Sequence, residues 1–183
     1  MLMNQLIAQL VHQGRRWVAQ QRMTYRDQGQ KLSPEAVAEF SRYFDGKLLQ
    51  EVRTVLVPAI DNPGFIDQYR SLFTLFKVPL LDFSTMSAIT FVDTILLVAG
   101  SVGSDIDPLV FHELVHVVQY DILGLDRFVE QFINGWVNQG FNYAAIPLEM
   151  DAYELQNRFE TEAGQAFEVR EEVAQRLELL LED

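Results

Sequence analysis

The segment 107–124, DPLVFHELVHVVQYDILG, limits the folds open to this chain more than any other part of the sequence. Its apolar residues recur at helical spacing, so it predicts a helix that is buried over most of its surface. Two of the chain's three histidines, His112 and His116, lie four residues apart in it. Residues at this spacing are about 40° apart around a helix, so both imidazoles face the same side. Any fold of this chain must therefore bury a mostly apolar helix that has two histidines on one side.

Glu113 follows the first histidine and completes the pattern H-E-x-x-H, which is typical of zinc sites. On a helix, Glu113 lies at the flank of the histidine face together with Tyr120. A carboxylate in so apolar a helix needs a partner, and no Lys or Arg occurs between Asp82 and Asp126. A core helix with two hydrogen-bonded histidines and no metal is the alternative interpretation. It leaves Glu113 without a partner, and we therefore favour a metal site.

A catalytic zinc ion needs a third protein ligand and one open position for water. The chain has no cysteine, and its remaining histidine, His12, lies far upstream in another segment, so we expect a carboxylate. Glu149 stands in the first turn of a predicted helix, and the small Ala152 on the same face allows that helix to approach the histidine helix closely. Asp151 and Glu154 point away from this face, so we choose Glu149 as the third ligand. The alternative is that Glu149 only stabilises the helix dipole.

The pattern of predicted elements indicates an α+β fold. A strand is predicted at 51–60, and a hairpin around Asp93 joins two further strands at 87–92 and 94–99. Helices are predicted at 2–20, from Pro34 onward behind Ser33 as N-cap, and at 64–76, 107–124, 125–139, 147–162 and 164–181. We therefore expect a small antiparallel or mixed sheet, a hairpin before the histidine helix, and a helical C-terminal half.

The chain has 183 residues, of which 49% are hydrophobic, and this is enough for one compact unit with a substantial core. We divide it into an N-terminal helical and strand part, 1–80, and a core that carries the histidine helix, 81–183. The predicted helix 2–20 is amphipathic and could pack on the body, bind a partner or lie on a membrane surface. Most amphipathic stripes are core faces, so we favour packing.

Charge and hydropathy exclude several classes of partner. The net charge of −12 repels nucleic acid and anionic lipid, so we expect neither as a partner. The longest apolar stretches are too short for a transmembrane segment, and the N-terminus lacks the pattern of a secretory signal. Together with the absence of cysteine, these features predict a cytoplasmic protein, and they leave its oligomeric state open.

The stretches HELVHVVQY and PLEMDAY, an H-E-x-x-H followed by a downstream E-x-x-A, resemble the gluzincins. These are zinc metallopeptidases that include thermolysin and the zinc aminopeptidases. With the hairpin sequence AITFVDTILLVAG, the chain is most similar to small gluzincin domains of bacteria, over roughly residues 86–160. The resemblance implies a zincin-like fold, a Zn²⁺ ion held by His112, His116 and Glu149, and Glu113 as general base.

The resemblance also implies an edge strand beside the substrate cleft, at 87–92 in this chain. The residues expected to bind the peptide main chain there are Ser87, Ala88, Ile89 and Thr90. No histidine follows His116 to stabilise the oxyanion, so Tyr153 or Tyr143 is expected in that role. The aminopeptidase signature G-x-M-E-N is absent.

Three functions follow as hypotheses. The first, which we favour, is a zinc-dependent peptidase that acts on a peptide or protein substrate. The second is a zinc-binding but catalytically inactive or latent relative that acts in regulation or protein interaction, and the missing histidine supports it. The third is a helical interaction domain without metal.

Overall fold

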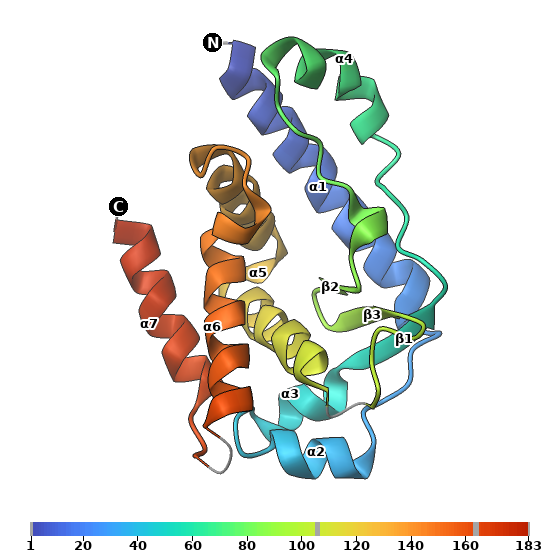
Figure 1. Ribbon diagram of the computed structural model, residues 1–183, viewed down its shortest axis with the longest axis vertical. Helices are drawn as coiled ribbons and strands as arrows, with labels where there is room; N and C mark the ends of the chain where they lie inside the picture. The colour runs from blue at the N-terminus through green and yellow to red at the C-terminus, as the bar shows by residue number, and fades with distance from the viewer. Residues whose placement is uncertain (1, 105–106, 163–164, 183) are drawn as a thin grey trace.

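A computed structural model describes residues 2–104, 107–162 and 165–182 of the chain (Figure 1). Within these ranges it is an α+β protein with seven α-helices and one small sheet of three strands. In chain order the elements are α1 (Leu2–Arg26), α2 (Pro34–Phe40), α3 (Gly46–Glu51), β1 (Arg53–Val57), α4 (Ile66–Phe76), β2 (Ala88–Phe91), β3 (Thr94–Val98), α5 (Pro108–Asn138), α6 (Pro147–Thr161) and α7 (Val169–Glu182). Two short 3₁₀ turns, η1 (Phe83–Thr85) and η2 (Tyr143–Ala145), lie before β2 and α6. The expected α+β class is confirmed, and the predicted helices of the first half are present as α1, α2 and α4, whereas α3 was not predicted.

The sheet has the strand order β1-β3-β2, with β1 parallel and β2 antiparallel to β3. The predicted hairpin is therefore confirmed, and β2 lies at an edge of a mixed sheet. Its turn contains Val92, whose φ of 64° is strained for a β-branched residue. The next residue, Asp93, forms ion pairs with Arg22 and Arg26 of α1, at 2.6 and 2.8 Å. These ion pairs hold the hairpin against α1.

Helix α1 packs along α5, as the amphipathic pattern predicts, and its buried face includes Leu6, Leu10 and Val18. The two helices cross closely at Gly14, where an added Cβ would lie 3.0 Å from a methyl group of Val129. The absence of a side chain at this position allows the close approach. The N-terminal segment is therefore part of the body of the protein.

Helix α5 carries the two histidines and is much longer than the predicted histidine helix. The predicted helices 107–124 and 125–139 follow each other without a loop, and Gly124 alone departs from helical geometry, with φ 72° and ψ 162°. Only glycine adopts this conformation readily. The break redirects the second half of α5, so that the ring of Phe128 stacks on Tyr120 with 3.6 Å between ring centroids.

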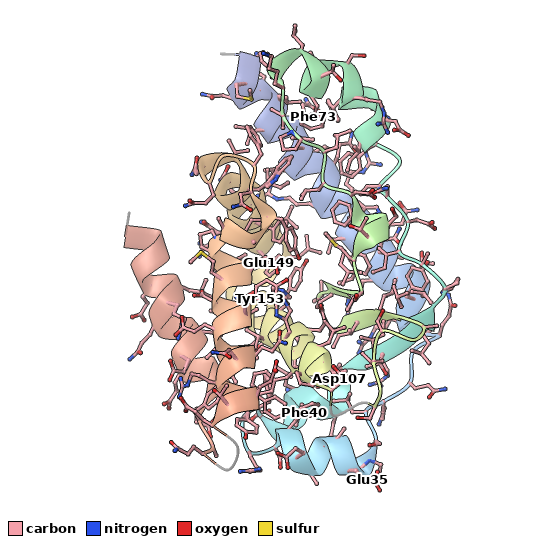
Figure 2. All side chains as sticks on the ribbon, viewed as in Figure 1. Glu35, Phe40, Phe73, Asp107, Glu149 and Tyr153 are labelled. Carbon is pink, nitrogen blue, oxygen red and sulfur yellow. The ribbon has the colours of Figure 1, made fainter. Side chains whose placement is uncertain are left out.

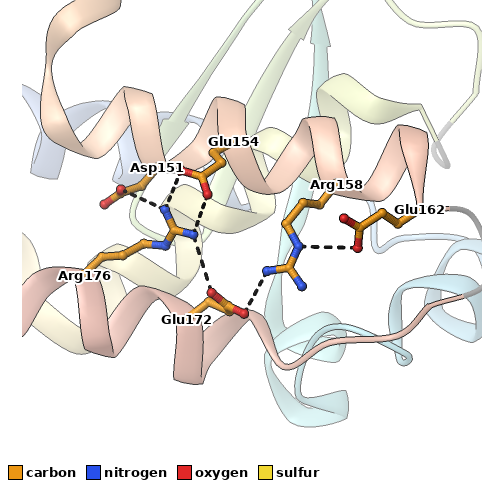
Figure 3. A network of polar contacts seen from close by, with 6 residues as sticks. All are labelled: Asp151, Glu154, Arg158, Glu162, Glu172 and Arg176. Atoms are coloured by element: carbon orange, nitrogen blue, oxygen red, sulfur yellow. Dashed lines mark hydrogen bonds and ion pairs between the residues drawn. The ribbon is translucent and has the colours of Figure 1, made fainter.

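Helices α6 and α7 lie side by side and are joined by an ion-pair network (Figure 3). Arg176 of α7 binds both carboxylate oxygens of Glu154 at 2.8 and 3.0 Å, and it also lies 3.5 Å from Asp151 and from Glu172. Helix α7 begins at Val169, later than the predicted residue 164; residues 163–164 lie outside the described ranges. The network fixes the outer face of α6, so its opposite face turns toward α5.

One hydrophobic core joins the two parts into which the sequence was divided. Its members come from both sides of residue 80, and β1 from the first part pairs with β3 from the second. In the described ranges, no helix combines the length and the hydropathy that crossing a membrane requires.

Candidate metal site

The second and third turns of α5 and the first turn of α6 bring His112, His116 and Glu149 together in the interior of the protein. All three are buried, with exposed fractions of 4%, 5% and 2%. Helix α5 starts at an N-cap, Asp107, whose side chain accepts a hydrogen bond from Leu109 N, and this fixes where the histidine turn begins. Figure 2 shows Glu149 on α6, on the side that faces the interior. The sequence-based expectation that these three residues lie together is confirmed.

The donor atoms of the three residues converge. The Nε2 atoms of His112 and His116 are 3.1 Å apart. The two oxygens of Glu149 face one imidazole each: Oε2 lies 3.4 Å from His112 Nε2, and Oε1 lies 3.4 Å from His116 Nε2. Ligand atoms about 2.0–2.1 Å from a tetrahedral ion are about 3.3–3.4 Å from each other. The spacing is close to the one that the three ligands of a small divalent cation require.

Gln119, one turn after His116, determines how that imidazole is presented. Gln119 Nε2 donates a hydrogen bond to the carbonyl oxygen of Leu148 at 2.9 Å, which orients the amide. Its oxygen then accepts from Nδ1 of His116 at 2.8 Å. Because this oxygen can only accept, the proton of neutral His116 is on Nδ1, and the lone pair of Nε2 faces Glu149. Gln119 thereby connects His116 to the backbone of Leu148, the residue before Glu149.

Two buried polar atoms of the cluster have no hydrogen-bond partner of normal geometry among the described residues: Nδ1 of His112 and Oε2 of Glu149. Buried polar atoms are almost always partnered, because leaving one unpaired is costly. Two imidazole nitrogens at 3.1 Å also repel each other when both present lone pairs. A cation between His112, His116 and Glu149 removes the repulsion and gives Glu149 Oε2 a partner, so this donor set fits a bound metal.

In the metal-free cluster, the pKa values of Glu149 and His116 are set by burial and by the attraction between the carboxylate and the imidazoles. Burial alone would raise the pKa of the Glu149 carboxyl, but the two histidines outweigh it and hold that pKa well below its usual range. Burial would lower the pKa of His116, but Glu149, with smaller contributions from Glu113 and Gln119, raises it to about 9. Glu149 is therefore the negative charge that would attract a cation to this cluster.

Glu113 lies beside the three candidate ligands and has a neutral partner. The hydroxyl of Thr90, on β2, donates a hydrogen bond to its Oε2 at 2.6 Å. Burial raises the pKa of Glu113, and the nearby histidines and the Thr90 hydrogen bond only partly oppose this effect. The sequence contains no Lys or Arg partner near Glu113 and does not point to Thr90, because this contact depends on how β2 lies across α5. A buried carboxyl with a raised pKa suits proton transfer.

The residues at and just before the edge strand β2 line two different spaces. Ser87 and Ala88 line a cleft of about 540 Å³, which we call the outer cleft and which also includes His112, Glu113 and Tyr153. The side chain of Thr90 instead faces Glu113, and Ile89 lines an inner apolar cavity. Of the four residues expected to meet a peptide, Ser87 and Ala88 thus border the outer cleft directly.

Both tyrosines proposed for the oxyanion lie at the site. The ring of Tyr153 packs over His112, with 4.5 Å between centroids, and 48% of Tyr153 is exposed at the outer cleft. Tyr143, on η2, lies near enough to Glu149 to feel its charge. Burial, followed by the Glu149 charge, raises the pKa of Tyr143 far above its usual value. Both tyrosines line the outer cleft, and Tyr153 is the one that packs on a candidate ligand.

We predict that Glu149→Gln lowers zinc affinity by more than about tenfold, because it removes the charge that holds the third ligand position. Asp151→Asn and Glu154→Gln are matched controls from the same helix, and both should leave zinc affinity unchanged. Their carboxylates pair with Arg176 on the opposite face of α6. Zinc titration against a competing chelator measures all three. If Asp151→Asn rather than Glu149→Gln releases the metal, the assignment of the ligand face of α6 is wrong.

Sequence reasoning missed the roles of Gln119 and Thr90 at this site. For Gln119 a signal was present, because it follows His116 by three residues on the histidine face of the helix. The contact of Thr90 with Glu113 joins segments distant in sequence and left no local signal. Comparison of the chain with known protein families, with curated proteins and with solved structures finds no match. The chemistry of the site therefore rests on the geometry of its own residues: a buried group of His112, His116 and Glu149 that could hold a metal ion.

Proposed function

We propose that this chain is a zinc-dependent peptidase with a zincin-like fold of the gluzincin type. One observation carries the proposal: a buried group of two histidines and a glutamate at metal-ligand spacing stands next to a carboxyl with a raised pKa. His112, His116 and Glu149 would hold the ion, and Glu113 would act on the water. Three protein ligands leave one position open, as in catalytic rather than structural zinc sites.

Bound zinc would polarise the scissile carbonyl and lower the pKa of the attacking water. Glu113 accepts the proton of that water and passes it to the leaving amine. Thr90 holds the carboxylate of Glu113 in place during both transfers. Tyr153, beside His112 at the outer cleft, is the candidate donor to the oxyanion, and the free edge of β2 offers main-chain hydrogen bonds to an extended peptide.

Zinc is the proposed metal because imidazole and carboxylate ligands without cysteine suit it. Two histidines and one carboxylate also bind iron in oxygenases. The position of Glu113 supports hydrolysis, since a buried carboxyl beside the ligands is the base that a hydrolytic mechanism requires. Metal analysis of the purified protein distinguishes the two ions.

A zinc-binding but inactive relative, acting in regulation or protein interaction, is the second candidate. It is supported by the absence of any histidine after His116, since a later histidine stabilises the oxyanion in the gluzincins.

Turnover of a mixed peptide library tests the proposal. The zinc-loaded protein should cleave peptides, the chelated protein should not, and added zinc should restore cleavage. Equal cleavage with and without zinc would contradict a metal-dependent mechanism. Stoichiometric zinc with no cleavage of any peptide would favour the inactive relative.

A further inference from the structure

A second space adjoins both the metal site and the outer cleft. It is an apolar cavity of about 140 Å³, and Glu113, His116 and Glu149 form one end of it. Its walls come from α1, from the segment before β2, from β2 itself and from the second half of α5. Leu10, Trp17 and Val18 of α1 are among the lining residues, and Phe132 lies opposite on α5. We call this space the inner cavity.

The residues that line the inner cavity determine which chemical groups it can bind. No Lys or Arg occurs among its described lining residues, and its carboxylates, Glu113 and Glu149, are at the metal end. A negatively charged group would face Glu113 and Glu149, and a positively charged group would lose its hydration against apolar walls. A peptide main chain would also leave its N–H and C=O groups unpaired. The lining therefore suits a neutral, apolar side chain without its backbone.

The inner cavity and the outer cleft meet at the residues that would carry out catalysis. Glu113 and Tyr143 line both spaces, and so does Ala88 of the edge strand. A substrate whose main chain lies in the outer cleft along Ser87 and Ala88 can therefore direct one side chain past Glu113 into the cavity.

The size of the cavity sets the size of the occupant. An engineered apolar cavity of about 150 Å³ in another protein takes up benzene, so about 140 Å³ accommodates one leucine, methionine or phenylalanine side chain. A side chain that enters this space gains dispersion contacts with its apolar walls.

We propose that the inner cavity is the specificity pocket of this site. It takes a single large, uncharged apolar side chain from the substrate residue next to the scissile bond, and helix α1 forms the wall that limits its depth. The proposal rests on the proposed peptidase function for the chemistry of the bond. The pocket itself needs neither metal nor turnover to bind a side chain, so it can be tested separately.

Intrinsic fluorescence reports occupancy directly, because both tryptophans of the chain, Trp17 and Trp136, line the inner cavity. The probes are N-acetyl amides of leucine, phenylalanine, alanine, glutamate and lysine, added to the metal-free and to the zinc-loaded protein. The leucine and phenylalanine amides should give a saturable change in both forms. The alanine, glutamate and lysine amides should bind at least about tenfold more weakly, the least expected when several methylenes leave an apolar pocket.

Two variants with opposite effects separate the pocket from general damage to the fold. Val18→Phe places a ring toward the cavity from α1 and should weaken leucine amide binding at least about tenfold. Phe132→Ala enlarges the cavity and should improve binding of a bulkier probe, N-acetyl-4-tert-butylphenylalaninamide, followed by calorimetry. Ala8→Leu, an exposed position on α1, is the matched control and should change neither affinity. Thermal unfolding shows whether each variant is folded.

The outcomes distinguish this proposal from the peptidase proposal. If the folded variants bind all amides like wild type, or if alanine and leucine amides bind equally, the cavity is not a specificity pocket. If peptides are cleaved with no preference for a large apolar residue at the scissile bond, the pocket proposal fails and the peptidase proposal stands. If the amides bind as expected and no peptide is cleaved, the peptidase proposal fails and the pocket stands.

Discussion

Replacement of His112 or His116 by alanine should remove stoichiometric zinc from the purified protein. Each histidine supplies one of three converging donors, and Nε2 of each lies 3.4 Å from an oxygen of Glu149. Loss of a ligand should cost more affinity than loss of a residue that merely orients one, which typically costs about 10–100-fold. Elemental mass spectrometry gives the metal content, and a chelator titration gives the affinity.

The third histidine of the chain provides the control for this experiment. His12 is exposed on α1 and lies outside the cluster, so His12→Ala should bind one zinc ion per chain, like wild type. The histidine variants should also be checked by circular dichroism, because both sites are buried. A wild-type protein that cannot be loaded with zinc would overturn the metal site and the peptidase function together.

Conversion of Glu113 to glutamine should separate catalysis from metal binding. Glu113→Gln keeps the size of the side chain and can still accept the hydrogen bond from Thr90, but it removes the basic carboxylate. Zinc content and thermal stability should stay near wild type, while peptide cleavage should fall by about two orders of magnitude or more, the usual scale for loss of a general base. Single-turnover cleavage of a fluorogenic peptide measures the loss.

Thr90→Val is the companion variant for Glu113→Gln. It keeps the shape of the side chain and removes the hydroxyl that holds Glu113, so cleavage should fall by less than in Glu113→Gln and zinc should remain bound. A Glu113→Gln protein that cleaves as fast as wild type would show that Glu113 is not the base. The observed activity would then belong to another group or to a contaminating peptidase.

The features of this structure that depend on residues close together in the chain could be predicted from the sequence. The spacing of His112 and His116 depends only on helix geometry, and their shared face is confirmed. Ser33 caps α2 as expected, since its Oγ accepts a hydrogen bond from Ala36 N. The choice of Glu149 as the residue facing the histidines also followed from positions around one helix. In each case residues close in sequence determine the geometry.

The parts that were missed depend on contacts between distant segments. Two helices were predicted where α5 is continuous, because a glycine such as Gly124 ordinarily marks the end of a helix. Here Gly124 only interrupts the helix. The inner cavity could not be predicted, because Trp17 and Phe132 become neighbours only when α1 packs against α5. Arg22 reaches Asp93 across 71 residues of sequence for the same reason. Such contacts leave no periodic pattern in the sequence.

The packing of α1 against α5 has a consequence for the order in which the protein folds. Arg15 on α1 binds the backbone carbonyl of Asp126, 111 residues later, so the first helix must wait for the fifth before it is buried. Closing so long a loop costs chain entropy before any contact compensates for it, which slows folding. During synthesis the ribosome releases α1 with its apolar face unprotected, and α6, which carries Glu149, emerges last of the site's elements. A nascent chain shorter than this cannot assemble the His112, His116 and Glu149 cluster, so the proposed hydrolytic activity would begin only after α6 has left the ribosome.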